Sequence, residues 1–214
     1  MVMDDIVSIT LLRHGITKEN KERKYIGWMD VCLDEDALKS DYVSKLYGSF
    51  DVIYTSDLKR CKETAELVTS SQAIIIEDRR LREINFGIWE GKTYQELKDS
   101  QHYQNWINEP FHTDLPEGEA FLQFKTRVLQ SWREIIAQFC QMQNRKILIV
   151  THGGTIRLLL DEYSPEYVHK SWWDWEIDYF GGYTLSWQRQ LLLEGGWRCT
   201  SSLVEPFTAK RAGS

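Results

Sequence analysis

The stretch TLLRHGITKEN, residues 10–20, decides the fold, because an apolar run ends there with Arg13, His14 and Gly15 side by side. Residues 6–12 are apolar enough to predict a strand that is buried on both faces. The stretch ILIVTHGGTIRLLL, residues 147–160, repeats the arrangement with a strand over 146–151, His152, two glycines and a helix over 155–163. Two buried strands therefore each end at a histidine that is followed by glycine.

The remaining pattern alternates strands and helices along the chain. It predicts further strands over 50–56, 73–76, 183–188 and 197–204 and helices over 33–48, 58–70 and 117–142, with Ser56 or Asp57 as the N-cap of the second helix. Such alternation predicts an α/β fold, a three-layer α/β/α sandwich around a mostly parallel sheet. We expect one domain over residues 1–214, with the aromatic-rich residues 85–117 as a small cap insertion over the C-terminal ends of the strands.

Composition excludes several classes of protein. The net charge of −6 over 214 residues argues against a general nucleic-acid binder. No apolar run approaches the length of a membrane span, and the N-terminal stretch carries acids where a signal peptide would carry Lys or Arg. The four cysteines form no C-x-x-C pair and are expected to be reduced. We therefore expect a cytoplasmic protein that binds neither nucleic acid nor membranes.

The two strand ends carry groups that suit a phosphate. A phosphate dianion needs arginine forks and backbone N–H groups, which glycine and a helix N-terminus supply. Arg13 and Gly15 form one such set, and Gly153 and Gly154 form another. Arg60 lies in the opening turn of the predicted helix after the second strand, at the same end of the sheet. In α/β sheets this end is where ligands bind.

A metal site is the competing interpretation, since two histidines can ligate a cation. No H-E-x-x-H, H-x-H or paired-cysteine pattern accompanies His14 and His152, however, and arginines beside the imidazoles would repel a cation. The sequence therefore favours a phosphate site, with neither a metal nor another cofactor.

An imidazole held beside a bound phosphate can act as a nucleophile, and the leaving alkoxide then needs a proton. The stretch RRLREINFGIWEG, residues 79–91, offers Glu83 in an apolar setting where desolvation favours a protonated carboxyl. Glu90 lies in the same stretch. Spacing alone does not choose between these two carboxyl groups.

Five ordered blocks of the chain resemble the histidine phosphatase superfamily, in its phosphoglycerate-mutase-like branch. They are LLRHGITKEN, YTSDLKRCKETAEL, LREINFGIWEGKTYQEL, PEGEAFLQFKTRV and ILIVTHGGTIR. The block LREINFGIWEG is most similar to phosphatases of the α-ribazole and broad-specificity bacterial kinds.

The resemblance implies that a small phosphorylated metabolite is hydrolysed through a phosphohistidine on His14, and that Glu83 rather than Glu90 donates the proton. It also implies a set of residues that complete or line the phosphate pocket: Arg13, Arg60, His152, Thr17, Asn20 and Gly153. Two alternatives stay open, a phosphoglycerate mutase and a phosphoprotein-binding relative without turnover.

Two stretches depart from the family pattern. VCLDEDALKSDY, residues 31–42, replaces a Pro-Leu-Thr turn, which leaves the packing of the helix predicted over 33–48 open. SWWDWEIDYFGGY, residues 171–183, matches none of the blocks and is expected either to pack beneath the cap or to form an apolar substrate wall.

Overall fold

The computed structural model describes residues 6–38, 50–69, 73–141, 146–165, 171–194 and 198–205. In this part of the chain the strands form one six-stranded sheet in the order β3-β2-β4-β1-β5-β6. The strands are β1 (Ile6–Arg13), β2 (Val52–Thr55), β3 (Ile74–Glu77), β4 (Ile147–Thr151), β5 (Gly182–Gln188) and β6 (Ser201–Glu205). The first four are mutually parallel where they pair, whereas β5 and β6 run antiparallel to their neighbours, which confirms the mostly parallel sheet.

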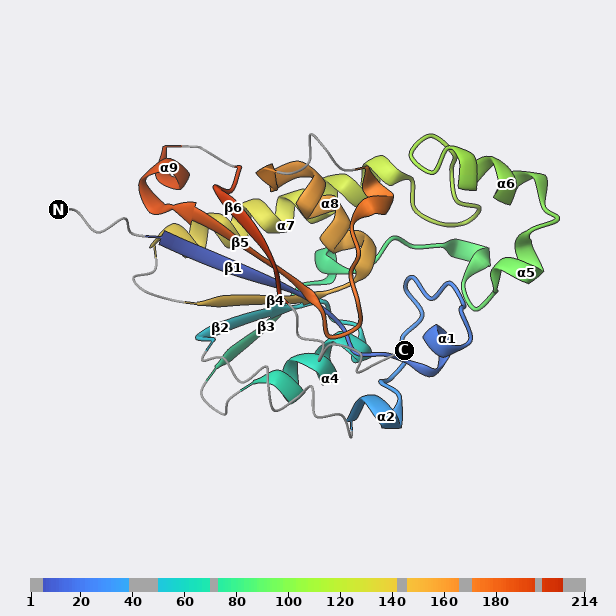
Figure 1. Cartoon of the computed structure of the whole chain (residues 1–214). Helices are drawn as coiled ribbons and strands as arrows, with labels where there is room; N and C mark the ends of the chain where they lie inside the picture. The colour runs from blue at the N-terminus through green and yellow to red at the C-terminus, as the bar shows by residue number, and fades with distance from the viewer. Residues whose placement is uncertain are drawn as a thin grey trace, which may run out of the picture.

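Helices cover both faces of the sheet, so the predicted three-layer sandwich is confirmed (Figure 1). Helices α7 (Phe121–Gln141) and α8 (Gly153–Tyr163) lie on one face, and α4 (Lys59–Val68) lies on the other. Successive residues of a strand point to opposite faces. Ile147 and Ile149 of β4 accordingly join the core beneath α7 and α8, while Leu148 and Val150 join the core beneath α4.

Shorter elements connect these layers. They are α1 (Lys18–Lys21), α2 (Glu35–Leu38), α5 (Tyr94–Leu97), α6 (Gln101–Asn108), α9 (Arg189–Leu193) and the 3-10 turns η1 (Arg79–Leu81), η2 (Gly87–Trp89) and η4 (Trp172–Asp174). Only the start of the helix predicted over 33–48 can be compared, because residues 39–49 lie outside the described residues. Helix α9, which follows β5 directly, was not predicted.

The predicted N-cap of α4 is wrong. The cap residue is Leu58, which makes no side-chain capping bond. Both predicted cap residues bind other groups instead: the Asp57 carboxylate accepts two hydrogen bonds from Arg82, at 2.6 and 2.7 Å, and the Ser56 hydroxyl lies 2.9 Å from Nε2 of His152. Residues that look like caps therefore stabilise the region around the strand ends.

Residues 85–117 hold η2, α5 and α6 beyond the C-terminal ends of the parallel strands (Figure 1, right). They carry a small core of their own, separate from the two cores against the sheet: Trp89, Leu97, Tyr103, Trp106 and Leu115. Thr93 caps α5, since its hydroxyl and the Glu96 carboxylate each accept a hydrogen bond from the other residue's N–H. This segment lies where the cap insertion was expected.

Among the described residues, no helix combines the length and the apolar character that a membrane span requires. All four cysteines are free thiols: Cys61 and Cys199 are buried, Cys140 is partly buried and Cys32 is exposed.

Candidate active site

The two predicted histidines meet because their strands are neighbours. Strands β1 and β4 pair in parallel with Arg13 opposite Thr151, so the residues that follow them leave the sheet at the same edge. The backbone N–H of His14 donates to the Thr151 carbonyl at 2.9 Å. The two imidazole centroids lie 5.2 Å apart, and both rings are almost completely buried.

The His14 ring is held in one tautomer. Its Nδ1 lies 2.7 Å from the Gly15 carbonyl oxygen, and a carbonyl only accepts, so Nδ1 carries the hydrogen. Burial, together with the Arg60 and Arg13 guanidinium groups, holds the pKa of His14 well below its ordinary value. The ring is therefore neutral near pH 7, and Nε2 keeps its lone pair for the cavity that His14 lines.

His152 uses both ring nitrogens within the protein. Nδ1 lies 3.2 Å from Nη2 of Arg60, which only donates, so Nδ1 accepts and Nε2 carries the hydrogen toward the Ser56 hydroxyl. Burial and Arg60 keep the pKa of His152 well below its ordinary value. His152 thus lines the same wall as His14 and also fixes the Arg60 guanidinium.

Arg60 is a charged side chain with 0% of its surface exposed. Its Nη1 donates to the Met29 carbonyl at 2.7 Å and its Nη2 to the Gly27 carbonyl at 2.6 Å. Its Nε is buried and has no hydrogen-bond partner among the described residues. Because an unmade bond at a buried donor is costly, this group suits an anionic ligand.

Arg13 shows similar features. Its Nη1 donates to the Ile177 carbonyl at 2.7 Å, and the Tyr179 ring lies 3.9 Å below its Cζ. Its Nε is also buried without a partner in the described part of the chain. Neither Arg13 nor Arg60 forms an ion pair with a described carboxylate within 4.0 Å.

A third arginine, Arg157, was missed by the sequence analysis. A Cβ built on Gly153 would lie 3.5 Å from Nε of Arg13 and 3.6 Å from Nη1 of Arg157, so two guanidinium groups flank this glycine. The signal was present, because Arg157 stands four residues after Gly153 on the same face of α8. We call the set Arg13, His14, Arg60, His152 and Arg157 the anion pocket.

The N-terminus of α8 completes the anion pocket. Gly153 is the first residue of this helix, where backbone N–H groups have no partner within the helix and favour anions. The next N–H, of Gly154, donates to Oε2 of Glu83 at 2.8 Å. A Cβ on Gly154 would lie 2.2 Å from Oε1 of Glu83, so only glycine allows this approach.

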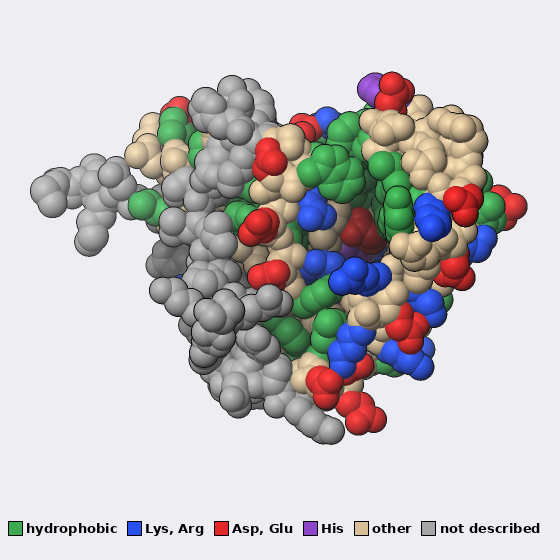
Figure 2. Space-filling view, turned by 45° about the vertical axis from the view of Figure 1, so that its right-hand side comes forward, with side chains coloured by type: hydrophobic (Ala, Val, Ile, Leu, Met, Phe, Trp, Pro, Cys, Tyr) green, Lys and Arg blue, Asp and Glu red, His purple; other side chains and the backbone are tan. Residues whose placement is uncertain are grey.

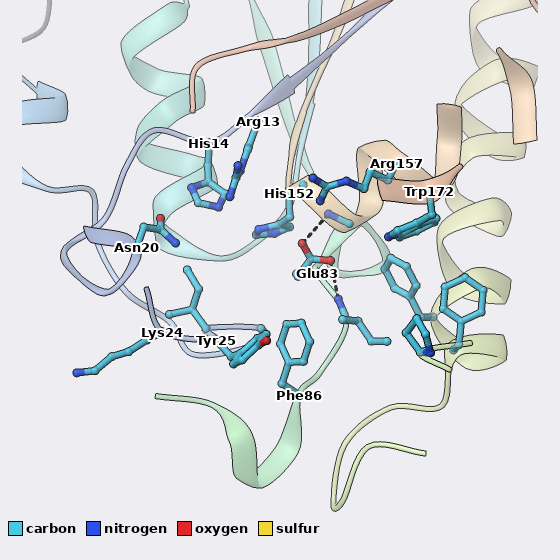
Figure 3. Close-up of a pocket in the computed structure, with 18 of the residues that line it drawn as sticks. Arg13, His14, Asn20, Lys24, Tyr25, Glu83, Phe86, His152, Arg157 and Trp172 are labelled. Atoms are coloured by element: carbon cyan, nitrogen blue, oxygen red, sulfur yellow. Dashed lines mark hydrogen bonds between the residues drawn. The ribbon is translucent and has the colours of Figure 1, made fainter. Parts of the chain in front are cut away.

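Glu83 and Glu90, which the sequence could not separate, lie in different places. Glu83 lines the cavity, and its Oε1 accepts a second hydrogen bond, from the Ile84 N–H at 3.0 Å (Figure 3). Glu90 is not among the cavity residues. Its Oε1 accepts from the backbone N–H groups of Trp28 and Phe86, at 2.7 and 3.1 Å. Burial raises the pKa of the Glu90 carboxyl. Glu90 thus ties the segment around Trp28 to the cap.

Asn20 and Thr17, which were both expected to line the pocket, have different positions in the structure. Asn20 lines the cavity, as predicted, whereas Thr17 is fully buried and is not a lining residue. The Thr17 hydroxyl accepts from the Asn20 N–H at 3.2 Å, and Oδ1 of Asn20 accepts from the Thr17 N–H at 3.1 Å. Thr17 therefore caps α1, and its two hydrogen bonds with Asn20 hold Asn20 in place.

The anion pocket opens into a larger cavity of about 740 Å³. Figure 2 shows it as a surface hollow in which Lys and Arg side chains face hydrophobic ones, with an acidic side chain at the floor. The hydrophobic part is lined by Tyr25, Phe86, Trp106, Phe111, Phe121, Phe124, Trp172 and Trp173. Residues 171–183 divide between two places. Trp172, Trp173 and Tyr179 line the cavity. Trp175 and Ile177 are buried in the core beneath α7 and α8, and Phe180 is buried in the core beneath α4, so the expected packing beneath the cap is not what buries them.

No group of three or more His, Cys, Asp or Glu side chains suited to a metal ion occurs among the described residues. The positive charge around His14 comes from arginines, which agrees with the expectation that no metal is needed. That expectation stays a prediction, and activity measurements must test it.

Comparisons with known proteins agree with this geometry. A family model described as the histidine phosphatase superfamily (branch 1) matches residues 9–199. The chain is 32% identical over 157 residues to the adenosylcobalamin/alpha-ribazole phosphatase of Escherichia coli K12, which covers 70% of this chain and 75% of the relative. It is 30% identical over 171 residues to phosphoglycerate mutase-like protein 4 of Arabidopsis thaliana, covering 75% of this chain and 73% of the relative.

Solved structures extend the likeness to the whole fold. The alpha-ribazole phosphatase from Shigella flexneri superposes with a TM-score of 0.72 at 27% identity, over 84% of this chain and 90% of that chain. The family match begins within β1 and includes His14, the cap, β4 and His152. The chain therefore belongs to the histidine phosphatase superfamily.

Proposed function

We propose that this protein is a phosphomonoesterase that works through a phosphohistidine on His14, with Glu83 as the proton donor. One observation carries the proposal. The neutral His14 ring is oriented by its Nδ1 bond to the Gly15 carbonyl. It lies in the same cavity as the Glu83 carboxyl and as two arginines whose Nε donors have no partner among the described residues. Phosphatases among the relatives support the same reaction class.

In the first step, the lone pair on Nε2 of His14 forms a bond to phosphorus while the bond from phosphorus to the alcohol oxygen breaks. Glu83 gives its proton to that oxygen, so a neutral alcohol leaves. The imidazole becomes positively charged, because Nδ1 keeps its hydrogen. The 2.7 Å hydrogen bond from Nδ1 to the Gly15 carbonyl stabilises that charge.

In the second step, a water oxygen attacks the phosphohistidine, and the Glu83 carboxylate takes the proton that the water gives up. The N–P bond breaks, and its electron pair returns to Nε2 of His14. Inorganic phosphate leaves, and both residues regain their starting forms.

The other residues of the anion pocket, together with two neighbouring groups, hold the phosphoryl oxygens through both steps. We assign this role to Arg13, Arg60 and Arg157, to the Gly153 N–H and to Asn20, with His152 supporting Arg60. The buried Nε atoms of Arg13 and Arg60 would gain partners when the phosphoryl group binds. Burial lowers the pKa of the Arg60 guanidinium, and an adjacent anion offsets that cost.

This arrangement predicts that activity survives a large excess of EDTA. The arginines and the α8 N-terminus already supply the charge that a metal would bring to the transition state. Phosphate release should be measured before and after treatment with the chelator. Loss of activity that zinc or magnesium restores would contradict the proposed pocket chemistry.

The proposal also predicts that phosphate release to water outpaces phosphate transfer. A mutase must keep its phosphoenzyme from water, whereas here the anion pocket opens into a surface hollow (Figure 2). Release of inorganic phosphate from p-nitrophenyl phosphate and from 3-phosphoglycerate should be compared with formation of 2-phosphoglycerate.

Each outcome of that comparison separates the candidate functions. Fast isomerisation with slow phosphate release would make the protein a mutase, in line with its mutase-named relatives. Binding of these esters without either reaction would identify the phosphoprotein-binding alternative.

A further inference from the structure

The cavity is far more apolar than a phosphate group requires. Beyond the anion pocket, three rings from separate segments meet in one cluster, which we call the aromatic cluster: Phe111, Phe121 and Trp172. The Phe111 and Phe121 centroids lie 4.6 Å apart, and the Trp172 centroid lies 5.4 Å from Phe111 and 5.7 Å from Phe121.

The aromatic cluster is only partly covered by the protein. Phe111 keeps 40% of its surface exposed, and the neighbouring Trp173 keeps 59%. Phe121 and Trp172 pack against the main core but are themselves only half-buried. A group of exposed aromatic rings inside a cavity marks a place where an apolar ligand would be buried.

The geometry of phosphoryl transfer relates the aromatic cluster to the reaction. The attacking and leaving atoms lie roughly in line on opposite sides of phosphorus. With Nε2 of His14 on one side, the leaving oxygen lies on the side of Glu83, and the rest of the alcohol extends further from His14. In Figure 3, Glu83 lies between His14 on the left and Trp172 on the right.

The cations that line the cavity divide between its two sides, because Arg157 lies beside Trp172 whereas Lys24 does not (Figure 3). Asn20 and Lys24 lie on the same side of the view as His14, away from Trp172 (Figure 3). An alcohol that leaves past Glu83 therefore meets Phe86 and the aromatic cluster rather than the lysine.

We propose that the substrate is a phosphomonoester whose alcohol carries an extended apolar group, which binds against the aromatic cluster formed by Phe111, Phe121 and Trp172. This inference rests on the proposed function for the position of the phosphate, and it adds the class of alcohol. An alkyl or aryl group of about six carbons or more would cover rings that water now contacts, at about 25 cal/mol for each Å² removed from water.

The test uses ethylphosphonate and hexylphosphonate, which bind without being hydrolysed, and measures their dissociation constants by calorimetry. The two probes share the anionic group and differ by four methylenes. Each buried methylene strengthens binding about four-fold, so we expect hexylphosphonate to bind on the order of 10²-fold more tightly. In parallel, kcat/KM for phosphate release should be measured with ethyl and hexyl phosphate.

Two variants should weaken this preference. Trp172→Ala and Phe111→Ala should each lower the hexyl-to-ethyl affinity ratio by roughly ten-fold, because each removes one ring of the aromatic cluster. Phe111 is the more exposed of the two residues, so its replacement is the milder change to the fold. Leu122→Ala is the matched control, since Leu122 neighbours Phe121, is 72% exposed and does not line the cavity. It should keep the wild-type ratio.

The outcomes separate this inference from the proposed function. A hexyl-to-ethyl ratio near one in the wild type, or an unchanged ratio in both ring variants, would overturn the apolar subsite even if phosphate release is fast. A steep ratio without any phosphate release would refute the phosphatase while the apolar subsite stands.

Discussion

Replacing His14 with alanine is expected to lower kcat by on the order of 10⁴ or more, because the whole double-displacement route is lost with the nucleophile. The loss should appear in kcat rather than in KM, since the arginines that bind the ester remain. The phosphoenzyme should vanish at the same time. Mass spectrometry of protein quenched in alkali during turnover would locate the phosphate, which we expect on His14 and on no other histidine.

His112→Ala is the matched control, because His112 is an exposed histidine of the cap. It should keep the wild-type kcat and the phosphoenzyme. Phosphate found on His152, or a phosphoenzyme that persists in His14→Ala, would show that the nucleophile is assigned to the wrong ring.

The centre of the site could be predicted from sequence because it depends on strand ends. Parallel neighbours release their next residues at a shared edge, so Arg13-His14-Gly15 and His152-Gly153-Gly154 had to meet once β1 and β4 paired. Arg60 followed for the same reason, since α4 begins beyond the end of β2. Local pattern and topology together determine such residues.

The outer part of the cavity could not be predicted in the same way. Phe111 follows α6, Phe121 begins α7, and Trp172 lies in η4, so their meeting depends on the paths of three connections rather than on a periodic pattern. The prediction of the α4 N-cap from residue propensity was wrong because a tertiary contact is made in its place. Asp57 accepts a hydrogen bond from Arg82 and does not cap α4. Thr17 shows the reverse case, because its capping role replaced the predicted place in the lining.

The choice between Glu83 and Glu90 also needed the fold. Both stand in one apolar stretch, but the 3-10 turn η2 (Gly87–Trp89) separates them and turns Glu90 toward Trp28. Glu83 instead accepts from the Gly154 N–H, beside the α8 N-terminus and the histidines. Proximity to the anion pocket supports Glu83 as the proton donor, and kinetics can test that role directly.

Replacing Glu83 with glutamine is expected to slow the hydrolysis of alkyl phosphates by about 10²–10⁴, the usual contribution of acid catalysis. Glutamine keeps the volume and the oxygen that can accept from Gly154, but it has no proton to transfer. Alkoxides are poor leaving groups and need that proton, whereas nitrophenolate leaves almost unaided. The same variant should therefore slow p-nitrophenyl phosphate far less, provided that formation of the phosphoenzyme limits the rate. The measurement is kcat/KM for both esters with the wild type and the variant.

Glu90→Gln is the matched control, because Glu90 lies in the same stretch, is half-buried and does not line the cavity. Any loss in that variant should fall equally on alkyl and nitrophenyl esters, since it would come from the altered contact with Trp28 and not from a missing proton. Equal losses on both esters in Glu83→Gln would reduce Glu83 to a positioning residue. A leaving-group dependence in Glu90→Gln alone would move the proton donor to Glu90, and the carboxyl that binds the Gly154 N–H would then have only a structural role at the α8 N-terminus.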